Sequence, residues 1–180
     1  MITVVTGNKN KAAEVAAFFA GITDVTHIAF DCVEPQADSV EDIARAKAEQ
    51  AYAALGVPLI VDDTGLFIDA LSGFPGPYAA YVQDTVRNTG ILRLMEGKED
   101  RDAHFTTAVA YADATGIQVF SGRVDGVITT EERGNEGFGY DPIFSVGGKT
   151  LAGMTLAEKN SLSHRARALA AFRNWYVGSA

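Results

Sequence analysis

Two adjacent carboxylates, Asp62 and Asp63, follow the apolar residues 59–61 and precede Thr64 and Gly65. Carboxylates crowded at the end of a buried strand repel one another and resist desolvation, so a bound cation is the simplest compensation. Successive strand residues point in opposite directions, so at most one of the two is expected to bind a metal directly. From these residues alone, an Asp-rich turn with Gly65 at positive φ is an equally good interpretation.

A lysine and a glutamate upstream could complete such a site. Lys47 lies on the helix face that Val40, Ile43 and Ala51 are expected to bury, where an ammonium group needs a partner or must reach solvent along the edge of the core. Glu34 precedes this helix in a predicted loop. Its carboxylate is either solvated or a hard oxygen ligand suited to magnesium.

Residues 6–11 read Thr-Gly-Asn-Lys-Asn-Lys and follow a β-branched run at residues 2–5. A strand that delivers a glycine turn to a helix N-terminus brings together backbone amides, the positive end of the helix dipole and two lysines. This arrangement can bind phosphate. The spacing is not that of a Walker A loop, and a plain Asn-capped helix with solvated lysines is the alternative.

Two further segments combine aromatic, basic and glycine residues. Residues 137–142 read Gly-Phe-Gly-Tyr-Asp-Pro, in which glycines allow close approach and two aromatic rings can stack on a nucleobase. A buried aromatic turn is the alternative. Near the C-terminus Lys159, His164 and Arg165 offer donors for a phosphate or a base carbonyl, unless they form a solvated basic helix end.

Composition limits the class of protein. A chain of 180 residues with 47% apolar content suits a single domain spanning residues 1–180, and one cysteine, Cys32, excludes an intramolecular disulfide. The net charge of -8 argues against a nucleic-acid-binding surface. No targeting segment or membrane span is expected, and a reducing cytoplasm fits best. Cys32 and Trp175 are assigned to packing.

The predicted elements alternate between strands and helices, which favours an α/β domain with a mixed sheet. Strands are predicted at residues 2–5, 25–30, 59–61, 103–111 and 118–128, the last two as an antiparallel hairpin. Helices are predicted after residue 8, at 40–55 with Ser39 as its cap, at 84–95, and from a Thr155–Glu158 capping box toward Trp175. Residues 73–77 are predicted to form a loop.

Taken together, four motifs in this order resemble the non-canonical purine NTP pyrophosphatase family, also called the inosine triphosphate pyrophosphatase or Ham1-like family. They are TGN-x-x-K at residues 6–11, DD-[ST]-G at 62–65, FGYDP at 138–142 and EK-x(4)-HR at 158–165. The resemblance covers nearly the whole chain. It implies an elongated α/β domain with a long twisted mixed β-sheet, two lobes flanking a central active-site cleft, and a homodimer.

The resemblance also implies roles for individual residues. Asp63 would be the catalytic carboxylate and, with Glu34, would bind Mg²⁺, while Lys47 would act beside it. Two positions depart from the family pattern: Glu34 precedes Pro35 rather than following a proline, and Thr64 replaces the commoner serine. The substrate contacts would be Thr6, Gly7, Asn8, Lys9, Asn10, Lys11, Thr64, Phe138, Gly139, Tyr140, Asp141, Lys159, His164 and Arg165.

The implied reaction converts ITP, dITP or XTP to the monophosphate and pyrophosphate by attack of water at the α-phosphorus. Adenine would be rejected because its amino group presents a donor where the site requires an acceptor. The partners would be the nucleotide alone, without nucleic acid or membrane. A Maf-like pyrophosphatase acting on other nucleotides and a non-catalytic nucleotide-binding sensor are the alternative functions.

Overall fold

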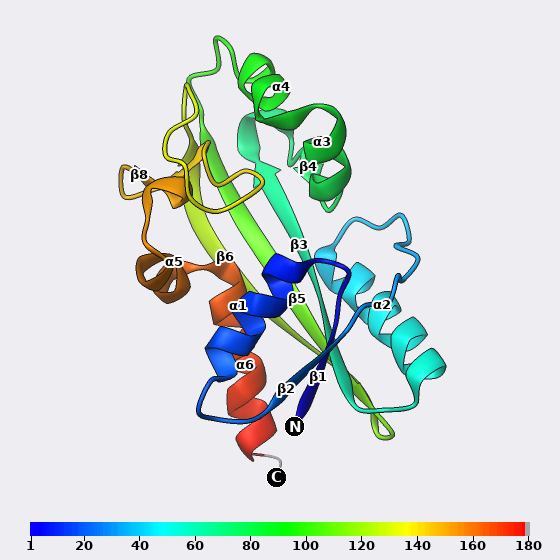
Figure 1. Ribbon diagram of the computed structural model, residues 1–180. Coiled ribbons are helices and arrows are strands. Elements are labelled where there is room, and N and C mark those ends of the chain that lie inside the picture. The colour runs from blue at the N-terminus through cyan, green and yellow to red at the C-terminus, as the bar shows by residue number, and fades with distance from the viewer. Residues whose placement is uncertain (179–180) are drawn as a thin grey trace. The chain divides into compact units, whose positions relative to one another are not determined.

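The computed structural model describes residues 1–178, which form a mixed α/β fold with one eight-stranded sheet (Figure 1). The strand order is β2-β1-β3-β5-β6-β7-β8, and β4 pairs with β3 outside this path. Strand β1 pairs in parallel with β2 and β3, while β4 pairs antiparallel with β3. The predicted mixed sheet is therefore confirmed.

The strands are β1 (Ile2–Val5), β2 (Val25–Ile28), β3 (Leu59–Ile68), β4 (Pro75–Gly76), β5 (Asp102–Asp113), β6 (Gly116–Ile128), β7 (Phe144–Val146) and β8 (Lys149–Thr150). The helices are α1 (Lys9–Phe19), α2 (Val40–Leu55), α3 (Ala79–Thr85), α4 (Arg87–Leu94), α5 (Leu156–Leu162) and α6 (His164–Gly178). Short 3-10 helices lie at Asp69–Leu71 and Leu151–Gly153. No helix among residues 1–178 is long and apolar enough to cross a membrane.

The chain divides into two compact units. Unit 1 comprises Met1–Asp63, Thr107–Gly122 and Arg165–Ala180, and unit 2 comprises Thr64–Thr106 and Arg123–His164. Each unit has its own hydrophobic cluster. The single domain and the cleft between lobes stay predictions.

In unit 1, helices α1 and α6 lie on one side of β1 and β3, and α2 lies on the other (Figure 1). Phe19 of α1 and Phe172 of α6 meet with ring centroids 6.0 Å apart. Val40 and Ile43 of α2 are buried, as the predicted helix face requires. Side chains that alternate along β3 therefore meet different helices.

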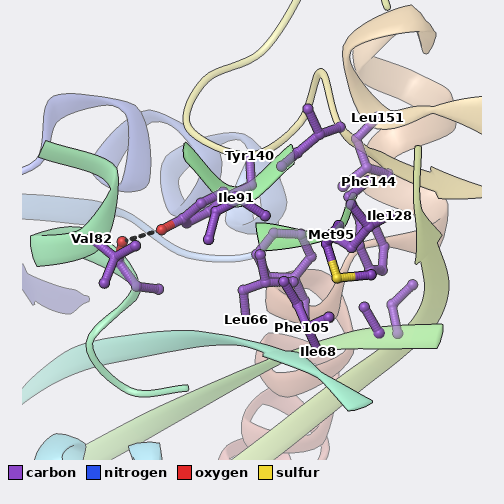
Figure 2. Close-up of a cluster of buried hydrophobic side chains, with 14 of the residues drawn as sticks. Leu66, Ile68, Val82, Ile91, Met95, Phe105, Ile128, Tyr140, Phe144 and Leu151 are labelled. Atoms are coloured by element: carbon purple, nitrogen blue, oxygen red, sulfur yellow. Dashed lines mark hydrogen bonds between the residues drawn. The ribbon is translucent and has the colours of Figure 1, made fainter. Parts of the chain in front are cut away.

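In unit 2, aliphatic and aromatic side chains from several elements form the core (Figure 2). Phe105 and Phe144 pack edge-to-face with ring centroids 4.7 Å apart, and Ile91 and Met95 of the α4 region are almost fully buried beside them. Tyr140, from the FGYDP segment, belongs to this core. The predicted base-binding segment is thus anchored by one of its own aromatic rings.

The structure corrects the expected turn at residues 62–65. Asp62 to Gly65 lie inside β3, which continues without a break to Ile68, and Gly65 does not have positive φ. The glycine is required for another reason: a Cβ atom there would lie 2.8 Å from the Gly76 carbonyl oxygen and 2.7 Å from the Phe67 ring. Gly65 lets β4 pair closely with β3.

Other boundaries also differ from the predictions, among them the end of β2 at Ile28 in place of residue 30. The helix expected at residues 84–95 is two helices, α3 and α4, because Arg87 adopts a φ of 61°. The loop expected at 73–77 contains the two-residue strand β4, and the last helical region is divided at Ser163. The caps at Ser39 and at Thr155 with Glu158 are confirmed.

Candidate active site

Strand β3 places the two adjacent carboxylates of unit 1 in different surroundings. Asp62 Oδ2 lies 3.1 Å from Lys11 Nζ of α1 and 3.1 Å from Arg165 Nε of α6. Asp63 Oδ1 lies 3.1 Å from Lys47 Nζ of α2. The strand's alternation therefore separates the pair, as expected from the sequence.

Asp63 combines burial with an incomplete set of partners. Its side chain is 8% exposed, and Oδ2 is buried without a hydrogen-bond partner among the described residues. Burial raises the pKa of Asp63 to about 6, against the opposing effects of the Lys47 and Lys11 charges. A carboxylate with this pKa can accept a proton near neutral pH, and its second oxygen has no donor among the described residues.

Lys47 joins Asp63 to Glu34. Its ammonium lies 2.6 Å from Glu34 Oε1, so the two carboxylates converge on one cation. Burial alone would lower the pKa of Lys47, but Asp63 and Glu34 raise it above its ordinary value. The helix face that buries Lys47 was predicted from the sequence, and the partner it required is Asp63.

Asp62 belongs instead to a buried network of charges. Burial acts to raise the pKa of Asp62, but Lys11 and Arg165 hold it well below its ordinary value. Arg165, whose side chain is 4% exposed, also donates through Nη1 to Glu14 of α1. Glu14 lies outside the sequence motifs, although its place three residues after Lys11 puts both on one helix face.

The Thr6–Lys11 segment forms a capped helix start. Asn8 Oδ1 accepts from the amides of Asn10 (2.9 Å) and Lys11 (3.3 Å), and Thr6 Oγ1 accepts from the Asn8 amide (3.1 Å). The Gly7 and Lys9 amides donate no hydrogen bond within residues 1–178. Both features of the sequence interpretation are therefore present, because the helix is Asn-capped and also retains donors at its N-terminus.

Unit 2 brings together the predicted base-binding residues. Asp141 Oδ2 accepts from the Phe138 amide (2.9 Å) and from Lys159 Nζ (2.8 Å). The same ammonium lies 4.7 Å from the centroid of the Phe138 ring. Gly137 is required because a Cβ atom there would lie 2.1 Å from Asp141 Oδ2. Asp141 therefore folds the segment and fixes Lys159 against it.

The other predicted residues of unit 2 contribute rings and packing. Tyr140 is buried, and its hydroxyl donates to the Ala79 carbonyl at 2.7 Å, shown as the dashed line in Figure 2. The His164 ring stacks on Phe105 with centroids 4.8 Å apart. Thr64 is half-buried in β3 beside Asp63.

Two residues outside the sequence motifs also hydrogen-bond to the predicted base-binding segment, residues 138–141, which is called the base segment below. Gln83 Nε2 and Asn88 Nδ2 both donate to the Gly139 carbonyl, at 3.2 and 3.0 Å. Their separation from Gly139 by 56 and 51 residues leaves no local signal in the sequence.

Removing the Lys47 charge provides a direct check on the electrostatics of Asp63. We expect Lys47→Met to raise the pKa of Asp63 above about 6, because Lys47 is the largest effect opposing burial. An NMR titration of the side-chain carboxyl carbon, recorded without divalent metal, measures this shift. Lys98→Met removes an exposed charge and should leave the titration unchanged. A lower pKa in Lys47→Met would contradict the expectation.

Known proteins match the chain along its length. The Ham1 family profile matches residues 2–175. The dITP/XTP pyrophosphatase of Methanopyrus kandleri is 48% identical over 176 residues, covering 95% of this chain and 93% of its own. That of Saccharolobus solfataricus is 47% identical over 174 residues, covering 95% and 91%. A HAM1 protein from Coxiella burnetii matches in structure with a TM-score of 0.87 and 29% identity, covering 99% and 100%.

The agreement extends from sequence to fold. The family profile leaves out only the first residue and the last five, and the structural match includes both compact units. The chain belongs to the Ham1 family.

Proposed function

We propose that this protein hydrolyses non-canonical purine nucleoside triphosphates, namely ITP, dITP and XTP, to the monophosphate and pyrophosphate. The observation that carries the proposal is Asp63, a buried carboxylate with a pKa of about 6 and one unpartnered oxygen, beside two lysines. The dITP/XTP pyrophosphatases named above support the substrate class. A homodimer and a cytoplasmic location remain part of the proposal.

The carboxylates fit a magnesium ion. Asp63 and Glu34 supply hard oxygen ligands, and Asp63 Oδ2 is a buried acceptor that lacks a partner among the described residues. No group of three or more His, Cys, Asp or Glu residues suited to a metal occurs within residues 1–178. Magnesium commonly uses one or two carboxylates together with phosphate oxygens and water, so two are sufficient. When bound, the ion supplies positive charge that offsets the charge of the phosphates.

The protein's own groups can then act on water and on the leaving group. Asp63 would take the proton from the attacking water, and its pKa of about 6 suits that transfer near neutral pH. The amides of Gly7 and Lys9, with the ammonium groups of Lys11 and Lys47, would stabilise the negative charge that develops on pyrophosphate. The Thr6 and Asn8 amides are already used within the fold.

The base would bind at the unit 2 segment. The Phe138 ring provides a face for stacking, and Lys159, held by Asp141, and His164 are its expected neighbours. The role expected of Arg165 as a further substrate donor stays a prediction. Its two carboxylate partners, Asp62 and Glu14, also give it a structural role.

Truncating the Phe138 ring should affect binding more than chemistry. We expect Phe138→Ala to raise the Michaelis constant for ITP by about tenfold, because stacking on an aromatic ring contributes roughly 1–3 kcal/mol per base. Its kcat should change less, since the ring would stack on the base and not on the phosphates. Steady-state kinetics with ITP measures both constants. An unchanged Michaelis constant would remove Phe138 from the base site.

A panel of triphosphates tests the proposed function. Pyrophosphate release would be measured for ITP, dITP, XTP, ATP and GTP, each with and without Mg²⁺. We expect rapid release from the first three only, and only with Mg²⁺. Equal release from ATP would favour an enzyme acting on other nucleotides. Binding of ITP without any product would favour a nucleotide sensor.

A further inference from the structure

Two side-chain amides from different helices converge on one backbone carbonyl of the base segment. Gln83 of α3 and Asn88 of α4 donate to Gly139 O at 3.2 and 3.0 Å. Asn88 is 6% exposed and Gln83 is half-buried. The Gly139 carbonyl therefore has two donors, supplied by residues that neither the sequence motifs nor the family assignment identifies.

Both amides are oriented so that their nitrogen atoms donate to this carbonyl, which leaves their own oxygen atoms without a donor among the described residues. Gln83 Oε1 and Asn88 Oδ1 are buried and accept no hydrogen bond from the described residues. Rotating either amide by half a turn would place its oxygen against the Gly139 oxygen, where two acceptors repel. The orientation of both amides is thus set by Gly139, and buried acceptors left without donors are rare enough to require an explanation.

The pair of amides fixes the peptide that joins Gly139 to Tyr140. This peptide is trans, so the Tyr140 N–H points away from the Gly139 C=O and hence away from the two amides. The Tyr140 N–H donates no hydrogen bond within residues 1–178. On its other side the peptide is anchored by the buried Tyr140 ring, whose hydroxyl donates to Ala79 O. The result is an immobilised backbone donor in the segment between the Phe138 and Asp141 side chains.

We propose that Gln83 and Asn88 are positioning residues for base specificity, which hold the Tyr140 N–H as a donor to the 6-oxo group of the purine. This inference rests on the proposed function. An oxo group accepts a hydrogen bond from this N–H, whereas the 6-amino group of adenine presents a second donor and leaves the N–H unpaired. A backbone donor that cannot rotate discriminates between the two bases better than a mobile side chain, because it cannot turn away from the wrong one.

Asn88→Asp tests the proposal with little change of shape. At neutral pH the introduced carboxylate has no proton to donate to Gly139 O. The peptide therefore loses the hydrogen bond from residue 88, and the negative charge of the carboxylate repels the Gly139 oxygen. The quantity to measure is the ratio of kcat/KM for ITP to kcat/KM for ATP, in the presence of Mg²⁺. We expect this ratio to fall by about tenfold or more, chiefly through the loss of ITP turnover. Gln83→Glu is the second variant if Asn88→Asp does not fold.

The control is Asn174→Asp, the same substitution at an exposed position of α6, which should leave the ratio unchanged. The ratio is independent of the folded fraction of the enzyme. A parallel fall in both rates with an unchanged ratio would therefore mean a purely structural role and would overturn the inference. If wild-type enzyme does not prefer ITP to ATP, the proposed function itself fails, whatever the variants do.

A binding measurement tests the contact without turnover. The Tyr140 amide signal in a ¹⁵N–¹H spectrum of the wild-type protein would be followed during addition of IMP and, separately, AMP. We expect a shift that saturates with IMP and no comparable shift with AMP. Loss of the IMP shift in Asn88→Asp would support the positioning role. A Tyr140 signal that IMP does not move would overturn it.

Discussion

The variant Asp63→Asn should hydrolyse ITP about 10³-fold more slowly than the wild type, because it would lack the proposed general base, whose loss removes roughly 10²–10⁴ in rate, and a proposed metal ligand. Asparagine keeps the shape of the side chain and cannot take up a proton from water. Steady-state pyrophosphate release at saturating Mg²⁺ measures the effect. Near-normal release would defeat the assignment of Asp63 as the catalytic carboxylate.

The same variant should remain folded. The pKa of Asp63 is raised from 3.8 to about 6 in the folded state, so the fold binds the proton more tightly than the unfolded chain does. The contribution of Asp63 to the free energy of unfolding is therefore lowest above about pH 6, where the carboxylate is ionised. This contribution rises as the pH falls through 6 toward 3.8. Asp63→Asn removes an unfavourable buried charge, and its melting temperature at pH 7 should not be lower than that of the wild type.

Replacing Arg165 by leucine should lower the free energy of unfolding by about 3–5 kcal/mol, which is typical of breaking a buried ion pair by removing one partner. Asp62 and Glu14 would each lose the guanidinium between them, and Asp62 would keep Lys11 as an ion-pair partner. Urea unfolding followed by circular dichroism measures the change.

Two comparisons separate this structural role from a substrate contact. Arg93→Leu removes an exposed arginine of α4 and should change the free energy of unfolding by less than about 0.5 kcal/mol. Glu14→Gln keeps a hydrogen-bond acceptor for Arg165 but removes its charge, so we expect an intermediate loss. If Arg165→Leu were as stable as the wild type and only raised the Michaelis constant, its role would be that of a substrate donor.

The sequence predicted the elements whose signals are local. The capped helix α2 was placed at its observed bounds because Ser39 and the apolar face both mark it. The turn at Asp62 to Gly65 was wrong because Asp, Thr and Gly favour turns locally, whereas pairing of β3 with its neighbours continues the strand. The division between α3 and α4 was missed because no residue there predicts the positive φ of Arg87.

The candidate site likewise contains residues that the sequence could place and contacts that it could not. Lys47 could be placed from helix periodicity, and its need for a partner followed from its burial. The partners of Arg165 and of the Gly139 carbonyl could not be predicted in this way, since Glu14 lies 151 residues from Arg165 and Asn88 lies 51 residues from Gly139. Contacts between such distant residues depend on topology, which the sequence pattern does not specify.

The positions of both carboxylates depend on the register of strand β3, which a shift of one residue would change. Moving β3 by one residue would place either Asp62 at the position of Asp63, beside Lys47, or Asp63 at the position of Asp62, beside Lys11 and Arg165. Its apolar residues are buried on both faces, so hydrophobicity does not choose between the two alignments either. A shift would, however, bring Thr64 or Leu66 to the place of Gly65, where no Cβ atom fits beneath the Gly76 carbonyl. Which aspartate lies beside Lys47, at the proposed catalytic position, is therefore determined by a glycine two residues away, through the absence of its side chain.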